Sequence, residues 1–176
     1  MTQWAERPEP LLEFYKAAYR VFAADPRASY MDLANDAEAM RLAAECGLRH
    51  LGGPLLGCVT AEGATVWLRT LRPAQVEVRL AIDGGETVFG PVHSSAETDL
   101  SAVVPISGLA PQTRYPYRVL VDGDEIPLPE GAAIVTAPLP NPPGKVRIAF
   151  GSCFHRWGLG NMRQAQAILS RQPAAM

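Results

Sequence analysis

The chain has 176 residues, of which 48% are hydrophobic, which is enough to build one or two domains with a buried core. Its 16 Lys and Arg side chains nearly balance 18 Asp and Glu, and a net charge of −2 excludes the strongly basic surface typical of nucleic-acid-binding proteins. No run approaches the roughly 18 apolar residues of a membrane span. The first residues resemble neither a signal peptide nor a twin-Arg signal, so we expect a cytoplasmic protein unless an export signal was removed.

Residues 1–50 are predicted to form an α-helical hairpin. Asp25-Pro26 separates two helical patterns, Ser29 with Asp32 gives a helix-start signal, and Gly47 is placed for a left-handed C-terminal cap. The two apolar stripes, spaced at three and four residues, consist of Leu11, Leu12, Tyr15, Ala18, Tyr19 and Phe22, and of Met31, Leu33, Ala34, Ala37, Met40, Ala43 and Ala44. Such stripes normally pack against a neighbouring core.

Residues 51–138 change to the period of two that is typical of half-buried strands. Asp83-Gly84 and Asp122-Gly123 are hairpin turn signals, because a type I′ turn requires positive φ. The pattern predicts seven short strands, at 54–60, 64–71, 75–82, 86–92, 99–106, 114–121 and 131–136. Strands of this length and spacing favour a β-sandwich, which makes the protein mainly β.

The segment from Ile106 to Gly123 resembles the corner between the fifth and sixth strands of fibronectin type III-like sandwiches. Its L-x-P-x-T-x-Y-x-Y pattern is made by Leu109, Pro111, Thr113, Tyr115 and Tyr117. In that fold a tyrosine hydroxyl bonds back to the backbone of the corner. The resemblance implies that Tyr115 and Tyr117 are core residues and that Trp67 is the core tryptophan of the second strand.

Several polar and sulfur-containing side chains receive structural interpretations. Cys46 and Cys58 have apolar neighbours in sequence, and we expect them in the core. His50 and His93 stand alone and are predicted to be structural or solvated. The remaining acidic cluster is predicted to be a solvated turn; it consists of Asp122, Asp124 and Glu125.

Residues 139–144 form a Pro-rich linker, predicted to be an extended spacer. Residues 145–176 then start a third unit: an apolar strand at 145–150, a loop, and a helix capped by Asn161 with an apolar face of Met162, Ala165, Ile168 and Leu169. The loop residues 158–161 could also offer a weak phosphate-binding helix N-terminus.

Cys153 and His155 are the leading candidates for chemistry, because they follow a strand at the position where open α/β sheets place ligands. A thiolate and an imidazole suit iron or zinc, but two ligands alone hold a metal poorly. The alternative is that Cys153 is a buried free thiol.

The sandwich, the Thr136-Ala137-Pro138 exit, the Pro-rich linker and the "RIAFGSC" strand end together resemble the alkaline phosphatase D (PhoD-like) family over residues 54–173. The resemblance implies phosphate-ester hydrolysis by metal-activated water, with iron and calcium as cofactors and Cys153 as an iron ligand. His155 matches the D-x-H spacing of related metallophosphoesterases, although PhoD-like sequences often carry another residue there.

The later motifs of that family, a Gly-Asp-x-x-Tyr strand end and further histidines and aspartates, are not in the sequence. We therefore expect the N-terminal portion of a longer enzyme, ending in a truncated α/β metallophosphoesterase domain and inactive alone. Its expected partner is the missing C-terminal catalytic domain, with a phosphate ester as substrate and neither nucleic acid nor membrane. The strand 145–150 could join two copies into a dimer. The alternative function is a non-catalytic fibronectin-like module that binds a protein or glycan through an exposed apolar or aromatic patch.

Overall fold

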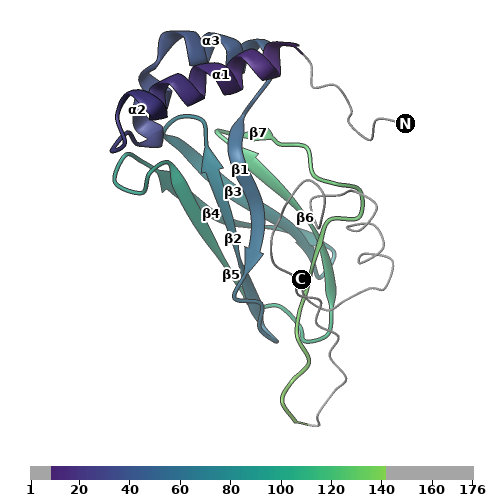
Figure 1. The fold of residues 1–176 in the computed structure, drawn as a ribbon. Helices are drawn as coiled ribbons and strands as arrows, with labels where there is room; N and C mark the ends of the chain where they lie inside the picture. The colour runs from purple at the N-terminus through teal and green to yellow at the C-terminus, as the bar shows by residue number, and fades with distance from the viewer. Residues whose placement is uncertain (1–8, 142–176) are drawn as a thin grey trace, which may run out of the picture.

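The computed structural model describes residues 9–141, which form a helical cap on two antiparallel β-sheets (Figure 1). The helices are α1 (Glu9–Ala24), α2 (Tyr30–Asn35) and α3 (Ala37–Glu45). The strands are β1 (His50–Gly57), β2 (Gly63–Thr70), β3 (Ala74–Ile82), β4 (Gly85–Ser94), β5 (Ser101–Ser107), β6 (Arg114–Val121), β7 (Asp124–Glu125) and β8 (Ala133–Val135). No helix within residues 9–141 is long and apolar enough to cross a membrane.

The second predicted helix is in fact two, because Asp36 interrupts it. Asp36 has an extended conformation, with ψ of 113°, and its carboxylate accepts a hydrogen bond from the Ala39 amide at 2.7 Å, so it ends α2 and caps α3. The predicted start of α2 is confirmed as a capping box in which Ser29 and Asp32 bond each other's backbone amides. The predicted cap at Gly47 is also confirmed, with φ of +65°.

Strands β1, β2 and β5 form a three-stranded sheet in the order β1-β2-β5, here called sheet A. Strands β4, β3, β6 and β7 follow one another in a five-stranded sheet, here called sheet B, in which β8 also pairs with β6. All pairs are antiparallel, and the two sheets face each other in a sandwich-like arrangement (Figure 1). The seven predicted strands are therefore present with shifted boundaries, and the two-residue β7 is an addition.

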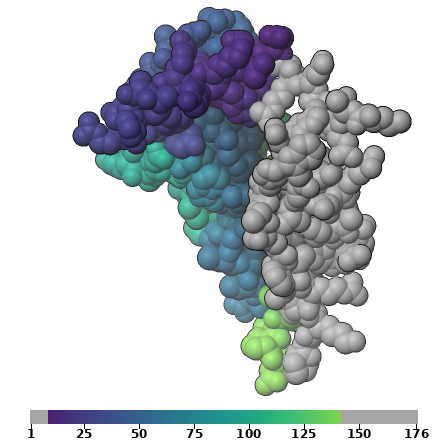
Figure 2. All heavy atoms as spheres, viewed as in Figure 1, coloured from purple at the N-terminus to yellow at the C-terminus, as the bar shows by residue number. Residues whose placement is uncertain are grey.

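The main core lies between the sheets and is built by alternation along the central strands, with consecutive buried residues only at the start of β2 and the end of β6 among these strands. Its fully buried side chains include Val66, Leu68, Val76, Val78, Leu80, Val104, Val119 and Ile134. A second cluster lies among the helices, where Phe14, Leu33 and Met40 pack with partly buried Leu48, Leu51 and Leu71 from the sandwich side. The helices consequently cover one end of the sandwich, as the space-filling view shows (Figure 2).

The two predicted hairpin turns have the backbone that their sequences require. Asp83 and Gly84 have φ of 51° and 80°, and Asp122 and Gly123 have φ of 51° and 85°. Positive φ at both central positions is the requirement of a type I′ turn. These turns set the register of β3 with β4 and of β6 with β7.

Trp67 is not the core tryptophan that the resemblance implied. Its neighbours Val66 and Leu68 are fully buried and point inward, so the pleat of β2 turns the half-buried Trp67 to the outer face of sheet A. The indole there lies over Gly52 and Gly53 of β1, where an added Cβ would come within 3.2 to 3.3 Å of the ring. Because two consecutive residues of β1 are glycines, there is room beside them for an outward-facing tryptophan ring.

Candidate functional site

The predicted metal ligands Cys153 and His155 lie outside the described residues, as do the strand 145–150 and the loop 158–161. Their proposed roles stay predictions. Within residues 9–141, no group of three or more His, Cys, Asp or Glu side chains could hold a metal ion. The described part of the chain therefore does not fit the iron and calcium that the family resemblance implies.

The two histidines of the sandwich lie on different sheets. His50 begins β1 and is half-buried, which lowers the pKa of its imidazole because burial disfavours the charged form; a hydrogen bond with the Gly53 backbone opposes that shift. His93 is exposed near the end of β4. Neither histidine joins a cluster of metal-binding groups in the described range.

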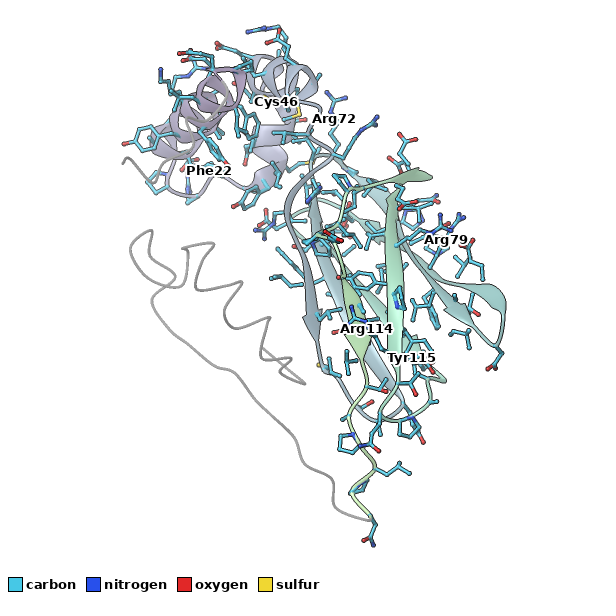
Figure 3. The ribbon with its side chains drawn as sticks, turned by 90° about the vertical axis from the view of Figure 1, so that its right-hand side faces the viewer. Phe22, Cys46, Arg72, Arg79, Arg114 and Tyr115 are labelled. Atoms are coloured by element: carbon cyan, nitrogen blue, oxygen red, sulfur yellow. The ribbon has the colours of Figure 1, made fainter. Side chains whose placement is uncertain are left out.

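The prediction that both early cysteines lie in the core was wrong. Cys58 is exposed and has φ of 46°, because it follows β1 in the connection that leads to β2. Cys46 is half-buried at the C-terminal cap of α3, at the junction with the sandwich (Figure 3). Local apolar neighbours in sequence do not determine burial when the residue stands at the end of an element.

The acidic cluster at the β6–β7 turn is exposed, as predicted. Asp122 uses its carboxylate to accept a hydrogen bond from the Gln75 amide at 2.8 Å, and Asp124 pairs with Arg49 at 2.9 Å. These contacts tie the turn to β3 and to the start of the sandwich. The carboxylates therefore have structural partners.

A cavity of about 410 Å³ lies between α3 and the adjacent end of the sandwich. Its apolar wall includes Met40, Leu48, Leu71 and Val121, and its polar rim consists of Arg49, Arg72 and Asp122. Arg72 lies at this junction in Figure 3. The rim carries charges of both signs; Arg49 is paired to Asp124, and Asp122 accepts a hydrogen bond from the Gln75 amide.

The corner before β6 holds the end of the sandwich with a hydrogen-bond network. The Tyr115 hydroxyl accepts a hydrogen bond from the Ala110 amide at 2.8 Å, which confirms the predicted tyrosine corner. The buried Thr136 hydroxyl donates to the Ala110 carbonyl at 2.6 Å and accepts from the Thr113 amide at 2.9 Å. Tyr115 of β6, labelled in Figure 3, and Thr136, which follows β8, therefore fix the same corner.

The same network fixes where the chain leaves the sandwich. The Ala137 amide donates to the Thr60 carbonyl at 2.9 Å, and the Ala137 carbonyl accepts from the Gln112 amide at 3.2 Å. The backbone of Ala137, just before Pro138, is thus hydrogen-bonded to the β1–β2 connection and to the corner before β6. The next segment begins from a defined point at the end of sheet A; we call this arrangement the exit clamp, formed by Thr60, Ala110, Tyr115, Thr136 and Ala137.

The outer faces of the two sheets differ in chemistry. On sheet B, ion pairs run along and across the strands: Arg79 contacts Glu77 of its own strand at 3.1 Å and Glu86 of β4 at 3.3 Å, and Arg118 of β6 contacts Glu86 and also Glu125 of β7, at 3.1 Å. Figure 3 shows Arg79 on the outer side of this sheet. Sheet B is therefore covered by charges that neutralise one another.

On sheet A the corresponding row is apolar. Leu55 of β1 is opposite Trp67 of β2, which is opposite Val103 of β5. Leu55 is 60% exposed and Val103 is 49% exposed. We call these three residues the sheet A row. They form an apolar surface across the three strands of sheet A, a kind of feature that marks interaction sites when it is contiguous.

A polar cluster borders the sheet A row on the side of the helices. The Arg69 guanidinium lies 4.0 Å from the centre of the Tyr30 ring and 5.5 Å from that of Trp67. Arg69 also donates to the Asp99 carboxylate at 3.1 Å. The guanidinium thus contacts an aromatic ring of the helical cap and one of sheet A, and thereby attaches the start of α2 to sheet A.

Residues 9–141 thus define a mainly β protein with two antiparallel sheets, a helical cap and a fixed exit. The chain belongs to the family described as "Domain of unknown function (DUF7800)", whose model matches residues 48–138. One solved structure, titled "Structure of PhoD", is similar at 19% identity with a TM-score of 0.43, over 56% of this chain and 21% of that chain. The chain therefore spans about a fifth of that protein's length. No curated protein matches the sequence.

Proposed function

We propose that this chain is the N-terminal portion of a PhoD-like metal-dependent phosphatase or phosphodiesterase, in which residues 9–141 are a non-catalytic accessory module. The proposal rests on the strand end "RIAFGSC" at 147–153, which comes after a sandwich and a Pro-rich linker in the order typical of that family. Hydrolysis of the phosphate ester would belong to the longer protein.

The finer fold assignment within this proposal is a fibronectin type III-like sandwich. It is supported by the three-stranded order β1-β2-β5 facing a sheet centred on β3 and β6, and by the hydrogen bond from the Ala110 amide to the Tyr115 hydroxyl. The outward position of Trp67 departs from that fold's usual core.

The observation that carries the accessory role is the exit clamp. Thr136 and Ala137 are hydrogen-bonded to Ala110, Thr113 and Thr60, so the linker starts in a fixed direction relative to both sheets. A domain that fixes the start of its linker can orient the next unit of the chain. A Pro-rich spacer is semi-rigid, so the direction of its first residues limits the direction of its last ones. In this proposal the sandwich orients the unit that carries Cys153 and His155.

Metal binding in the proposed enzyme falls to residues after 141. Cys153 would supply a thiolate ligand and His155 an imidazole, and the remaining ligands of an iron and calcium site would come from the catalytic domain beyond them. Residues 9–141 contain no group of three or more His, Cys, Asp or Glu side chains that could hold a metal ion.

The first test is the coding sequence downstream of Met176. The proposal expects it to continue and to supply Gly-Asp-x-x-Tyr and later histidines and aspartates; a stop codon directly after Met176 would overturn it. The second test compares the longer protein with the 176-residue chain in hydrolysis of p-nitrophenyl phosphate and bis-p-nitrophenyl phosphate. Activity is expected only in the longer protein, with loss of bound iron in its Cys153→Ser variant.

The second candidate function is a non-catalytic module that binds a protein or glycan. The exposed sheet A row of Leu55, Trp67 and Val103 favours it, because an apolar and aromatic patch on one sheet is the feature that such a module requires. A stop codon after Met176 together with glycan or protein binding lost in Val103→Glu would make this the better account.

A further inference from the structure

The sheet A row lacks the network of ion pairs that crosses the outer face of sheet B, although the Arg69 guanidinium lies 5.5 Å from the centre of the Trp67 ring. Val88 on the outer face of β4 and Val103 on that of β5 are similarly exposed, at 47% and 49%. Val88, however, is opposite Arg79 within the ion-pair network, whereas Val103 is opposite Trp67 and continues to Leu55. Within residues 9–141, the apolar row therefore extends over all three strands of sheet A, whereas Val88 on sheet B lies beside ion pairs.

The exit clamp starts the next part of the chain at one end of the sheet that carries this surface. Ala137 is bonded to Thr60, which follows the last residue of β1, Gly57, by three positions. Leu55 is two residues before Gly57 on the same strand. The linker consequently leaves from one end of the strands that carry the sheet A row, with Leu55 two positions and Trp67 and Val103 four positions from the residues at that end, and its Leu139 is 46% exposed.

The residues after the linker carry a matching apolar stripe. The sequence predicts a helix from about residue 161, with Met162, Ala165, Ile168 and Leu169 on one face. The stretch 142–161 can extend over roughly 60 Å, more than the length of sheet A, whose eight-residue strands span about 26 Å. Because both partners belong to one chain, the effective concentration of the stripe at the sheet is high.

We propose that the apolar stripe of Met162, Ala165, Ile168 and Leu169 packs on the sheet A row of Leu55, Trp67 and Val103 within the same chain. Helix on sheet is a standard way to bury one apolar stripe against one apolar face. A helix of about 12 residues is roughly 18 Å long and fits along the strands of sheet A. The proposal stands whether or not the longer protein hydrolyses phosphate esters.

The test is hydrogen exchange by mass spectrometry on the monomeric 176-residue chain, read at peptides covering 162–169. These amides are expected to be protected in the parent chain, and to exchange at least tenfold faster in Val103→Glu and in Leu55→Glu. The matched control is Val88→Glu, which places the same charge at an equally exposed valine on sheet B and is expected to leave 162–169 protected. Peptides containing Tyr115 report whether each variant keeps its sandwich.

A second variant changes the apolar stripe instead of the sheet, so that its effect cannot come from a disrupted sheet A. Ile168→Glu changes only the stripe, and in a Trp4→Phe, Trp157→Phe background it is expected to increase iodide quenching of Trp67. Unprotected amides at 162–169 in the parent chain would overturn the proposal, as would equal protection in all three glutamate variants. Protection that grows with protein concentration would assign the face to a second copy, which also overturns the proposal.

Discussion

The Asp99 carboxylate accepts a hydrogen bond from the Tyr30 amide at 2.9 Å, although 69 positions separate the two residues in sequence. Tyr30 is the first residue of α2, and Asp99 precedes β5 with φ of +50°. A carboxylate at a helix start also meets the positive end of the helix. Asp99 therefore joins the helical cap to sheet A while it holds Arg69 in place.

Replacing Asp99 should loosen the cap. Asp99→Gly tolerates the positive φ but removes both contacts, so we expect the free energy of unfolding to fall by about 1–2 kcal/mol. Asp99→Asn keeps an acceptor for the Tyr30 amide and should cost less. Urea unfolding gives the energies, and hydrogen exchange of residues 30–35 gives the local effect. Unchanged exchange of α2 in Asp99→Gly would contradict this role.

The tyrosine corner should contribute measurably to stability. Tyr115→Phe removes the acceptor of the Ala110 amide and leaves the ring in place, so the expected loss is about 1–2 kcal/mol of unfolding free energy. Tyr19→Phe is the matched control, because Tyr19 is 74% exposed on α1. Equal urea midpoints for the two variants would show that the corner hydrogen bond has no net effect.

A comparison of alanine substitutions at Gly53 and Gly84 distinguishes the cost of backbone strain from the cost of a steric clash. Both have positive φ, of 85° and 80°, so alanine at either costs about 1–2 kcal/mol. At Gly84 an added Cβ meets nothing within 4 Å, whereas at Gly53 it would lie 2.6 Å from the Trp67 carbonyl oxygen. We therefore expect Gly53→Ala to lose about 1–3 kcal/mol more than Gly84→Ala in thermal or urea unfolding. Similar losses would refute the close contact of β1 with Trp67.

His50 should make stability depend on pH in a defined direction. Its pKa in the folded protein lies below the ordinary value of 6.5, so the unfolded chain takes up a proton first as the pH falls. The contribution is complete above pH 6.5 and decreases below it until the folded pKa is reached. His50→Gln should flatten the unfolding free energy in this window. An unaltered pH profile in His50→Gln would exclude His50 as the cause.

Local rules predicted the parts of the fold that depend on local chemistry. The turns at Asp83-Gly84 and Asp122-Gly123 and the helix start at Ser29 follow from short-range backbone requirements, and the structure contains all three. The tyrosine corner was predicted from its resemblance to the fibronectin type III-like corner, and the partner of Tyr115, Ala110, lies only five positions away. The division of the helical region at Asp36 was missed, although the aspartate itself is a known capping residue.

Long-range contacts account for the remaining differences. The Trp67 ring is accommodated on the outer face by Gly52 and Gly53 of the neighbouring strand, which have no side chains to occupy its place. No local sequence pattern predicts this contact between two strands. Thr136 closes the corner with Ala110 across 26 positions. The proposed metal ligands Cys153 and His155 stay predictions from sequence, since they come after the described residues.

The placement of the cap and the exit clamp at opposite ends of the sandwich has a practical consequence (Figure 1). The central strands, each about 26–30 Å long, separate the helices from Ala137. We expect the strands to keep this separation constant. Dyes attached on α1 and at Leu139 should therefore report a narrow distance distribution. The distance between these two dyes would give a fixed reference, against which a change in the distance from α1 to a dye in the next segment can be measured.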